Sequence, residues 1–137
     1  MKEQFVTYEI ALKLKELGFD ELCFGYYNPD EELIYGIDIK MIKYAYKYHK
    51  EDESVLAPLW QQVIDWLRNE HDIVIEIVRQ KYFDTYANSY AYEVVCKVYK
   101  NKELEGSVVI RDNKNNHIFY SYEEARERAI LKAIELC

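Results

Sequence analysis

Residues 58–78 read PLWQQVIDWLRNEHDIVIEIV, a helical pattern followed at once by a strand pattern. Pro58 suits the first turn of a helix, because its missing N–H would be unpaired there anyway. The apolar side chains recur at the spacing of one helix face: Leu59, Trp60, Val63, Trp66 and Leu67. We therefore predict a helix over Pro58–Glu70. A strand is predicted over Ile73–Val78, since its isoleucines alternate.

Downstream, the sequence predicts two more strands and a final helix. Tyr90–Tyr99 and Leu104–Arg111 alternate as strands, and the polar turn Asn101–Glu103 separates them. Ser121 and Glu124 form a capping box that starts the last helix. Its predicted buried stripe consists of Ala125, Ala129, Ile130, Ala133 and Ile134. Such small side chains favour a close approach of this helix to a sheet.

Upstream, a helix is predicted over Tyr8–Leu17. Thr7 can cap its first turn, and Gly18 can end it in a left-handed conformation. Two strands should follow as a hairpin around an Asn-Pro-Asp-Glu turn, at Glu21–Tyr27 and Glu32–Ile39.

Residues Lys40–Lys50 fit two patterns. Tyr44, Tyr46 and Tyr48 alternate with Ala45 and Lys47, which is the period of a strand. The alternative is a helical stripe formed by Ile37, Met41, Tyr44, Ala45 and Tyr48. We favour the strand for the tyrosines, although periodicity alone does not decide so short a segment.

These elements predict an α+β protein in the order α-β-β-(β)-α-β-β-β-α, with antiparallel sheet covered by about three helices. The chain has 137 residues, of which 50% are hydrophobic, so we expect one domain over residues 1–137 with a packed core.

The charge and the cysteines suggest a cellular setting. The net charge of −7 disfavours nucleic acid and membrane surfaces as partners, because both are anionic. Three cysteines without a paired motif indicate buried thiols in a reducing compartment, and the first residues lack the apolar core of a signal peptide. We expect a cytosolic protein without a membrane span.

No catalytic, cofactor or metal motif stands out. Cys23, Cys96 and Cys137 lack the setting of a reactive thiolate, and the three histidines are too far apart in sequence to form a known metal motif. No phosphate-binding glycine loop occurs among the four glycines. We expect no cofactor and favour a non-enzymatic role, with a small enzyme of unrecognised site as one alternative.

A second alternative is a nucleic-acid-associated protein. The helix at Pro58–Glu70, the three strands and the helix at Tyr122–Leu136 have the α-β-β-β-α order of a double-stranded RNA-binding domain, and the start of the last helix loosely resembles that family. That family places lysines at this helix start, whereas Glu123 and Glu124 stand here. Charge of this sign opposes contact with phosphates.

Three longer stretches resemble another group of proteins. They are residues 5–19, residues 57–68 with the sequence APLWQQVIDWLR, and residues 120–130. Together they resemble short uncharacterised proteins of phages, prophages and mobile elements of gut Bacteroidales. The resemblance implies a bacterial or phage cytosolic setting. It carries over no activity and no catalytic residue.

The tyrosine content suggests what the protein does. The chain contains 14 tyrosines, a residue type that is enriched in the cores of protein interfaces. We therefore expect a protein-binding module that uses an aromatic and acidic surface to bind another protein or a second copy of itself. Tyr44, Tyr46 and Tyr48 are the candidate interaction face.

Overall fold

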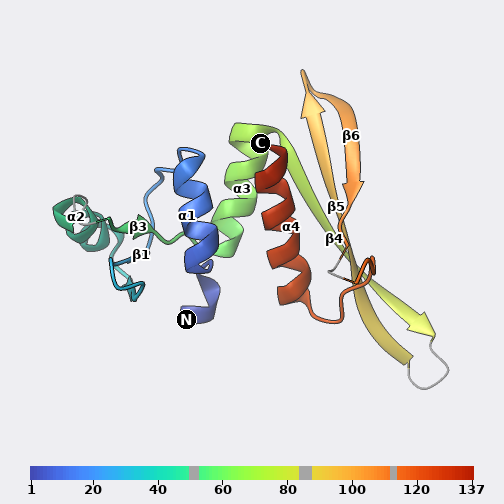
Figure 1. Ribbon diagram of the computed structural model, residues 1–137, viewed down its shortest axis with the longest axis horizontal. Helices are drawn as coiled ribbons and strands as arrows, with labels where there is room; N and C mark the ends of the chain where they lie inside the picture. Colours follow the sequence, from blue (N-terminus) through green and yellow to red (C-terminus); the bar gives the residue numbers. More distant parts are fainter. Residues whose placement is uncertain (50–52, 84–87, 112–113) are drawn as a thin grey trace. The chain divides into compact units, whose positions relative to one another are not determined.

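The computed structural model describes the backbone of residues 1–49, 53–83, 88–111 and 114–137, and the side chains of these residues except 48–49, 80–83 and 88–90. Within these ranges, four α-helices and two antiparallel three-stranded sheets confirm the α+β class (Figure 1). None of the helices described is long and apolar enough to cross a bilayer. The chain divides into two compact units, residues 1–63 and 64–137.

The first unit contains a short 3-10 helix and all elements up to the start of α3: η1 (Lys2–Gln4), α1 (Tyr8–Glu16), β1 (Gly25–Tyr27), β2 (Leu33–Tyr35), α2 (Ile39–His49) and β3 (Val55–Leu56). The second unit contains most of α3 and the elements after it: α3 (Trp60–His71), β4 (Ile73–Phe83), β5 (Asn88–Lys100), β6 (Glu103–Val109) and α4 (Tyr122–Leu136). The predicted helix at Pro58–Glu70 is therefore confirmed, with its start two residues later.

In the first unit, β1 is the central strand of a sheet with the order β2-β1-β3. The predicted hairpin is confirmed, but its strands are shorter than expected, and Tyr26 lies opposite Ile34. Gly25 has no room for a side chain, because a Cβ there would lie 2.9 Å from the Phe5 ring and 3.1 Å from the Ile34 carbonyl oxygen. Glycine thus allows the ring to pack against the start of β1.

Both predicted ends of α1 are confirmed. The Thr7 hydroxyl accepts a hydrogen bond from the Ile10 N–H at 3.4 Å. Gly18 has φ +90° and follows the helix, with the Gly18 N–H donating to Lys15 and the Phe19 N–H donating to Leu14. This pair of bonds is a Schellman motif, which satisfies the last carbonyls of a helix. Phe19 is buried, as such a motif favours.

The prediction of a strand in Lys40–Lys50 is wrong, because residues 40–49 belong to helix α2, and Lys50 lies outside the described residues. The Asp38 carboxylate accepts hydrogen bonds from the Lys40 and Met41 N–H groups at 3.0 and 3.4 Å, which is the geometry of an N-cap. Ile42 is the buried anchor of the helix, and α2 contacts β1. The alternation of tyrosines therefore does not reflect a strand; these residues lie in a helix.

In the second unit, the strands form an antiparallel sheet in the order β4-β5-β6. The alternating isoleucines of β4 lie opposite alternating apolar residues of β5: Ile73 with Val98, Ile75 with Cys96, and Ile77 with Val94. Helix α4 runs alongside β4 and β5 (Figure 1). The Cys96 sulfur lies 3.6 Å from the Ala129 carbonyl oxygen, so the alanine stripe does allow the close approach expected.

The α4 cap and the second hairpin are also confirmed. The Ser121 hydroxyl accepts the Glu124 N–H at 3.1 Å, and Ala125, Ala129, Ile130 and Ala133 are fully buried. Lys100 pairs with Glu103 across a two-residue turn, in which Asn101 and Lys102 have φ +52° and +67°. Two left-handed residues match a type I′ turn, for which Asn-Gly is the favoured sequence.

We predict that Lys102→Gly stabilises the protein. Glycine adopts a positive φ without the steric cost that lysine incurs, so the free energy of unfolding should rise by roughly 0.5–1 kcal/mol. Chemical denaturation followed by circular dichroism measures this change. Lys102→Ala removes the same charge but keeps a Cβ, and it should give no gain. An equal gain from both variants would show that charge, not backbone conformation, is responsible.

Candidate interaction surface on helix α2

Five exposed residues lie on one side of α2. Lys43, Lys47, Lys40, Tyr44 and Met41 follow one another around an arc of about 160° when 3.6 residues make a turn. We call these five residues the outer face of α2. Tyr44 is 74% exposed and Met41 is 69% exposed, which is high for side chains of this kind. Large apolar side chains gathered in solvent are typical of a binding surface.

The outer face is positively charged in an acidic protein. Helix α2 contains three lysines among residues 39–49 and no aspartate or glutamate, although the chain as a whole has a net charge of −7. Among the described residues, no ion pair joins Lys40, Lys43 or Lys47 to a carboxylate. The aromatic surface expected to be acidic is therefore basic where Tyr44 lies.

The structure separates the tyrosines that the sequence grouped together. Tyr44 is exposed, whereas Tyr46 is half-buried with its ring 6.2 Å from the ring of Tyr26, and burial raises the pKa of Tyr46. Two residues apart on a helix, these side chains point about 200° apart. The side chain of Tyr48 lies outside the described residues. Tyr44 and Tyr46 hence do not form one face.

Sequence reasoning missed Met41 and the lysines as members of the site. The signal was present, because Ile37, Met41 and Tyr44 follow a helical spacing and Asp38 stands in a cap position. That spacing normally marks a buried stripe. Here Ile37 is 88% exposed, and the inward side of α2 is formed by Ile42, Ala45 and Tyr46 instead.

A cavity of about 260 Å³ lies beside the inward side of α2. Its lining comes from α2, from the segment between α1 and β1, and from β3: Asp20, Glu21, Leu22, Cys23, Ile42, Lys43, Tyr46, Lys47 and Leu56. The Gln62 amide donates hydrogen bonds to the Leu22 carbonyl oxygen at 2.8 Å and to the Glu21 carboxylate at 3.3 Å. These bonds hold the segment that forms one wall.

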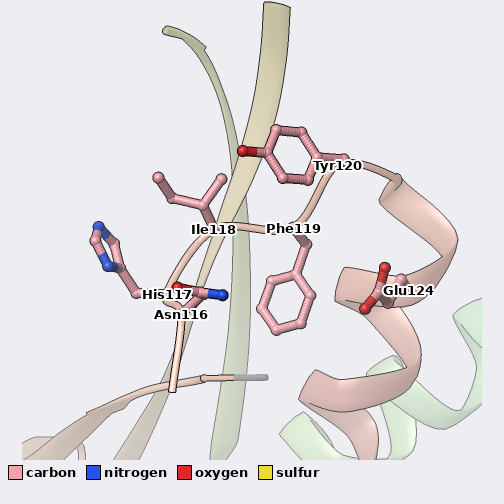
Figure 2. A pocket seen from close by; sticks show the side chains of 6 residues that line it. All are labelled: Asn116, His117, Ile118, Phe119, Tyr120 and Glu124. Carbon is pink, nitrogen blue, oxygen red and sulfur yellow. The ribbon is translucent and has the colours of Figure 1, made fainter. Parts of the chain in front are cut away.

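A second hollow, of about 200 Å³, lies in the other unit where the chain enters α4 (Figure 2). His117 and Glu124 lie on opposite sides of Phe119 in this view, and the Phe119 side chain is buried. The imidazole Nε2 of His117 lies 3.7 Å from the Glu93 carboxylate instead. The helix N-terminus is already capped by Ser121. The hollow thus brings together no nucleophile and base.

The cysteines are poorly suited to nucleophilic chemistry. Burial raises the pKa of Cys23 to about 12 and that of Cys96 to about 11. Both thiols therefore remain protonated near neutral pH, where a nucleophile has to be a thiolate. Among the described residues, no group of three or more histidine, cysteine or acidic side chains could hold a metal ion.

Comparisons with protein-family models, with curated proteins and with solved structures find no match to this chain. The residues that bear on function are therefore assigned from exposure, charge and geometry alone.

We predict that only one thiol of the folded protein reacts rapidly with a maleimide at about pH 8. Cys137 is exposed, whereas Cys23 and Cys96 are buried and hold their protons well above that pH. Raising the pH should speed modification of the buried thiols, because their thiolate fraction grows up to pKa values near 12 and 11. Mass spectrometry counts the modified sites.

Full modification in denaturant is the control for the thiol measurement, since all three cysteines are then accessible. Rapid labelling of Cys23 or Cys96 in the native protein would contradict the burial described above.

Proposed function

We propose that the protein is a non-enzymatic binding module, and that the outer face of α2 binds an acidic and apolar segment of a partner protein. The observation that carries this proposal is the pairing of Met41 and Tyr44, both largely exposed, with three lysines on the same side of one helix. A partner segment with apolar side chains between carboxylates complements this surface in both polarity and charge.

The apolar residues and the lysines would contribute differently. Tyrosine is among the side chains that most often dominate interface energetics, and methionine adapts to partners of varied shape. Exposed lysines add little affinity each, but they raise the association rate and select partners by charge. Binding should therefore depend strongly on Tyr44 and Met41, and its rate should depend on salt.

The proposed setting is the cytosol of a bacterium that carries phage or mobile-element genes. Its support is the resemblance of residues 5–19, 57–68 and 120–130 to proteins of phages and mobile elements of Bacteroidales, together with the absence of disulfides among the described cysteines. A partner from the host or from the phage fits this setting, and so does a second copy of the chain.

A second candidate function is association with RNA. It is supported by the order α3-β4-β5-β6-α4, which is the order of a double-stranded RNA-binding domain. Glu123 and Glu124 in the first turn of α4 count against it, because they place negative charge where that family contacts phosphates. Order alone is a fold-level analogy and is the weaker argument.

The proposal predicts that the double variant Met41→Ser/Tyr44→Ser loses its partner while it stays folded. Both side chains are exposed, so their removal should change the free energy of unfolding by less than about 0.5 kcal/mol. Capture of partners by tagged protein from bacterial lysate, with and without nuclease and at two salt concentrations, measures the effect. We expect one stoichiometric protein that resists nuclease and disappears with the double variant.

Tyr120→Ser is the matched control, because Tyr120 is also 74% exposed but lies before α4. It should leave binding unchanged. Equal loss with Tyr120→Ser, or no loss with the α2 variant, would contradict the proposed surface. Capture that nuclease abolishes would favour the RNA-associated function. Sedimentation of the purified protein tests whether the partner is a second copy.

A further inference from the structure

We propose that the cavity beside α2 is a binding site for an apolar α-amino acid in its zwitterionic form. The cavity combines an apolar floor with side chains of both charges, and it lies within the first unit. The proposal concerns a small molecule and not a partner protein. Lys43 and Lys47 belong both to the outer face of α2 and to the cavity lining, whereas Met41 and Tyr44 do not line the cavity.

The floor of the cavity is apolar and already ordered. Cys23 is 2% exposed and Ile42 is 8% exposed, and Leu56 of β3 and Leu22 complete the apolar lining. The Cys23 thiol donates to the Glu21 carbonyl oxygen at 3.3 Å, so its only polar hydrogen is already used. An aliphatic or aromatic side chain resting on Cys23 would therefore not leave this thiol without its hydrogen bond.

The charged lining comes from two separate elements. Lys43 and Lys47 stand one turn apart on α2, and Asp20 and Glu21 lie on the segment that precedes β1. The Glu21 carboxylate also accepts a hydrogen bond from the Gln62 amide at 3.3 Å. Two cations and two anions around one apolar floor suit a ligand that carries both an ammonium and a carboxylate.

Other classes of ligand fit this lining less well. A simple carboxylate would be attracted by Lys43 and Lys47 but repelled by Asp20 and Glu21. A simple amine would be attracted by the two acidic residues but repelled by the two lysines. A neutral apolar molecule would use the floor alone. A zwitterion with an apolar side chain is the small molecule that satisfies the floor and both charges together.

The size of the cavity agrees with this class. A volume of about 260 Å³ is smaller than a site for a drug-sized ligand, which usually needs about 300–1,000 Å³. At about 30 Å³ for each water in the liquid, the cavity corresponds to roughly nine waters. Leucine has about that many non-hydrogen atoms, so the cavity has room for one amino acid of this size.

The test is a titration of the ¹⁵N-labelled full chain with L-leucine, L-methionine and L-phenylalanine, followed by amide chemical shifts. We expect saturable shifts at Leu22, Cys23, Ile42 and Leu56. N-acetyl-L-leucine lacks the ammonium and L-leucinamide lacks the carboxylate. The affinity of each should therefore be lower than that of leucine by a factor of about ten or more. Glycine, which lacks the apolar side chain, should cause no shifts.

Two variants connect the shifts to the cavity. Leu22→Trp places a larger side chain at a half-exposed position of the lining and should abolish binding. Lys43→Gln/Lys47→Gln should weaken leucine binding, and Lys40→Gln is the matched control, because Lys40 is on the same helix but does not line the cavity. Thermal unfolding by circular dichroism confirms that each variant is folded.

The proposal is overturned if none of the three amino acids causes saturable shifts at the cavity, or if leucine, its acetyl derivative and its amide bind equally. It is also overturned if folded Leu22→Trp binds as the wild type does. The outer-face proposal is judged separately by Met41→Ser/Tyr44→Ser, because neither residue lines the cavity. That variant should bind leucine normally.

Discussion

The pairing of β1 on both of its edges is the constraint on which the first unit depends. Tyr26 pairs with Ile34 on one side and with Leu56 on the other, so β1 has no free edge for a further strand. Residues 39–49 instead cover β1 as a helix, with Ile42 and Tyr46 turned inward. The side of the helix that faces away from β1 carries side chains that β1 cannot bury. The outer face of α2 is a consequence of this geometry.

The charge of the whole chain conceals the charge of this surface. A net charge of −7 indicates an acidic molecule that attracts basic partners, and this describes the charge averaged over the whole chain. A binding surface responds to its local field, however, because salt screens charges more than about 8–10 Å away. If α2 binds a partner as proposed, the three lysines beside Met41 and Tyr44 set the local field that the partner meets. The field of three lysines attracts acidic segments and repels basic ones.

The second unit has a different character. Its apolar face is closed by α4, whose alanines bring the helix backbone to 3.6 Å from the Cys96 sulfur. The pairs Ile73–Val98, Ile75–Cys96 and Ile77–Val94 lie on the sheet face that bears Cys96. Its hollow at the start of α4 holds polar side chains that point apart (Figure 2). The features that suggest binding are more pronounced in the first unit, around α2.

The sequence by itself determined the elements that local chemistry specifies. The Thr7 and Ser121 caps, the Gly18 stop, the Asn101–Lys102 turn and the α4 alanine stripe each depend on residues close in the chain, and each was found where it was predicted. Tertiary structure alone decided the state of residues 39–49 and which of their side chains face solvent. Their periodicity fits both a strand and a helix. In the structure, Asp38 caps the helix, and Ile42 is buried where the helix contacts β1. The cavity likewise joins residues 20–23, four residues of α2 and Leu56, which no local pattern connects.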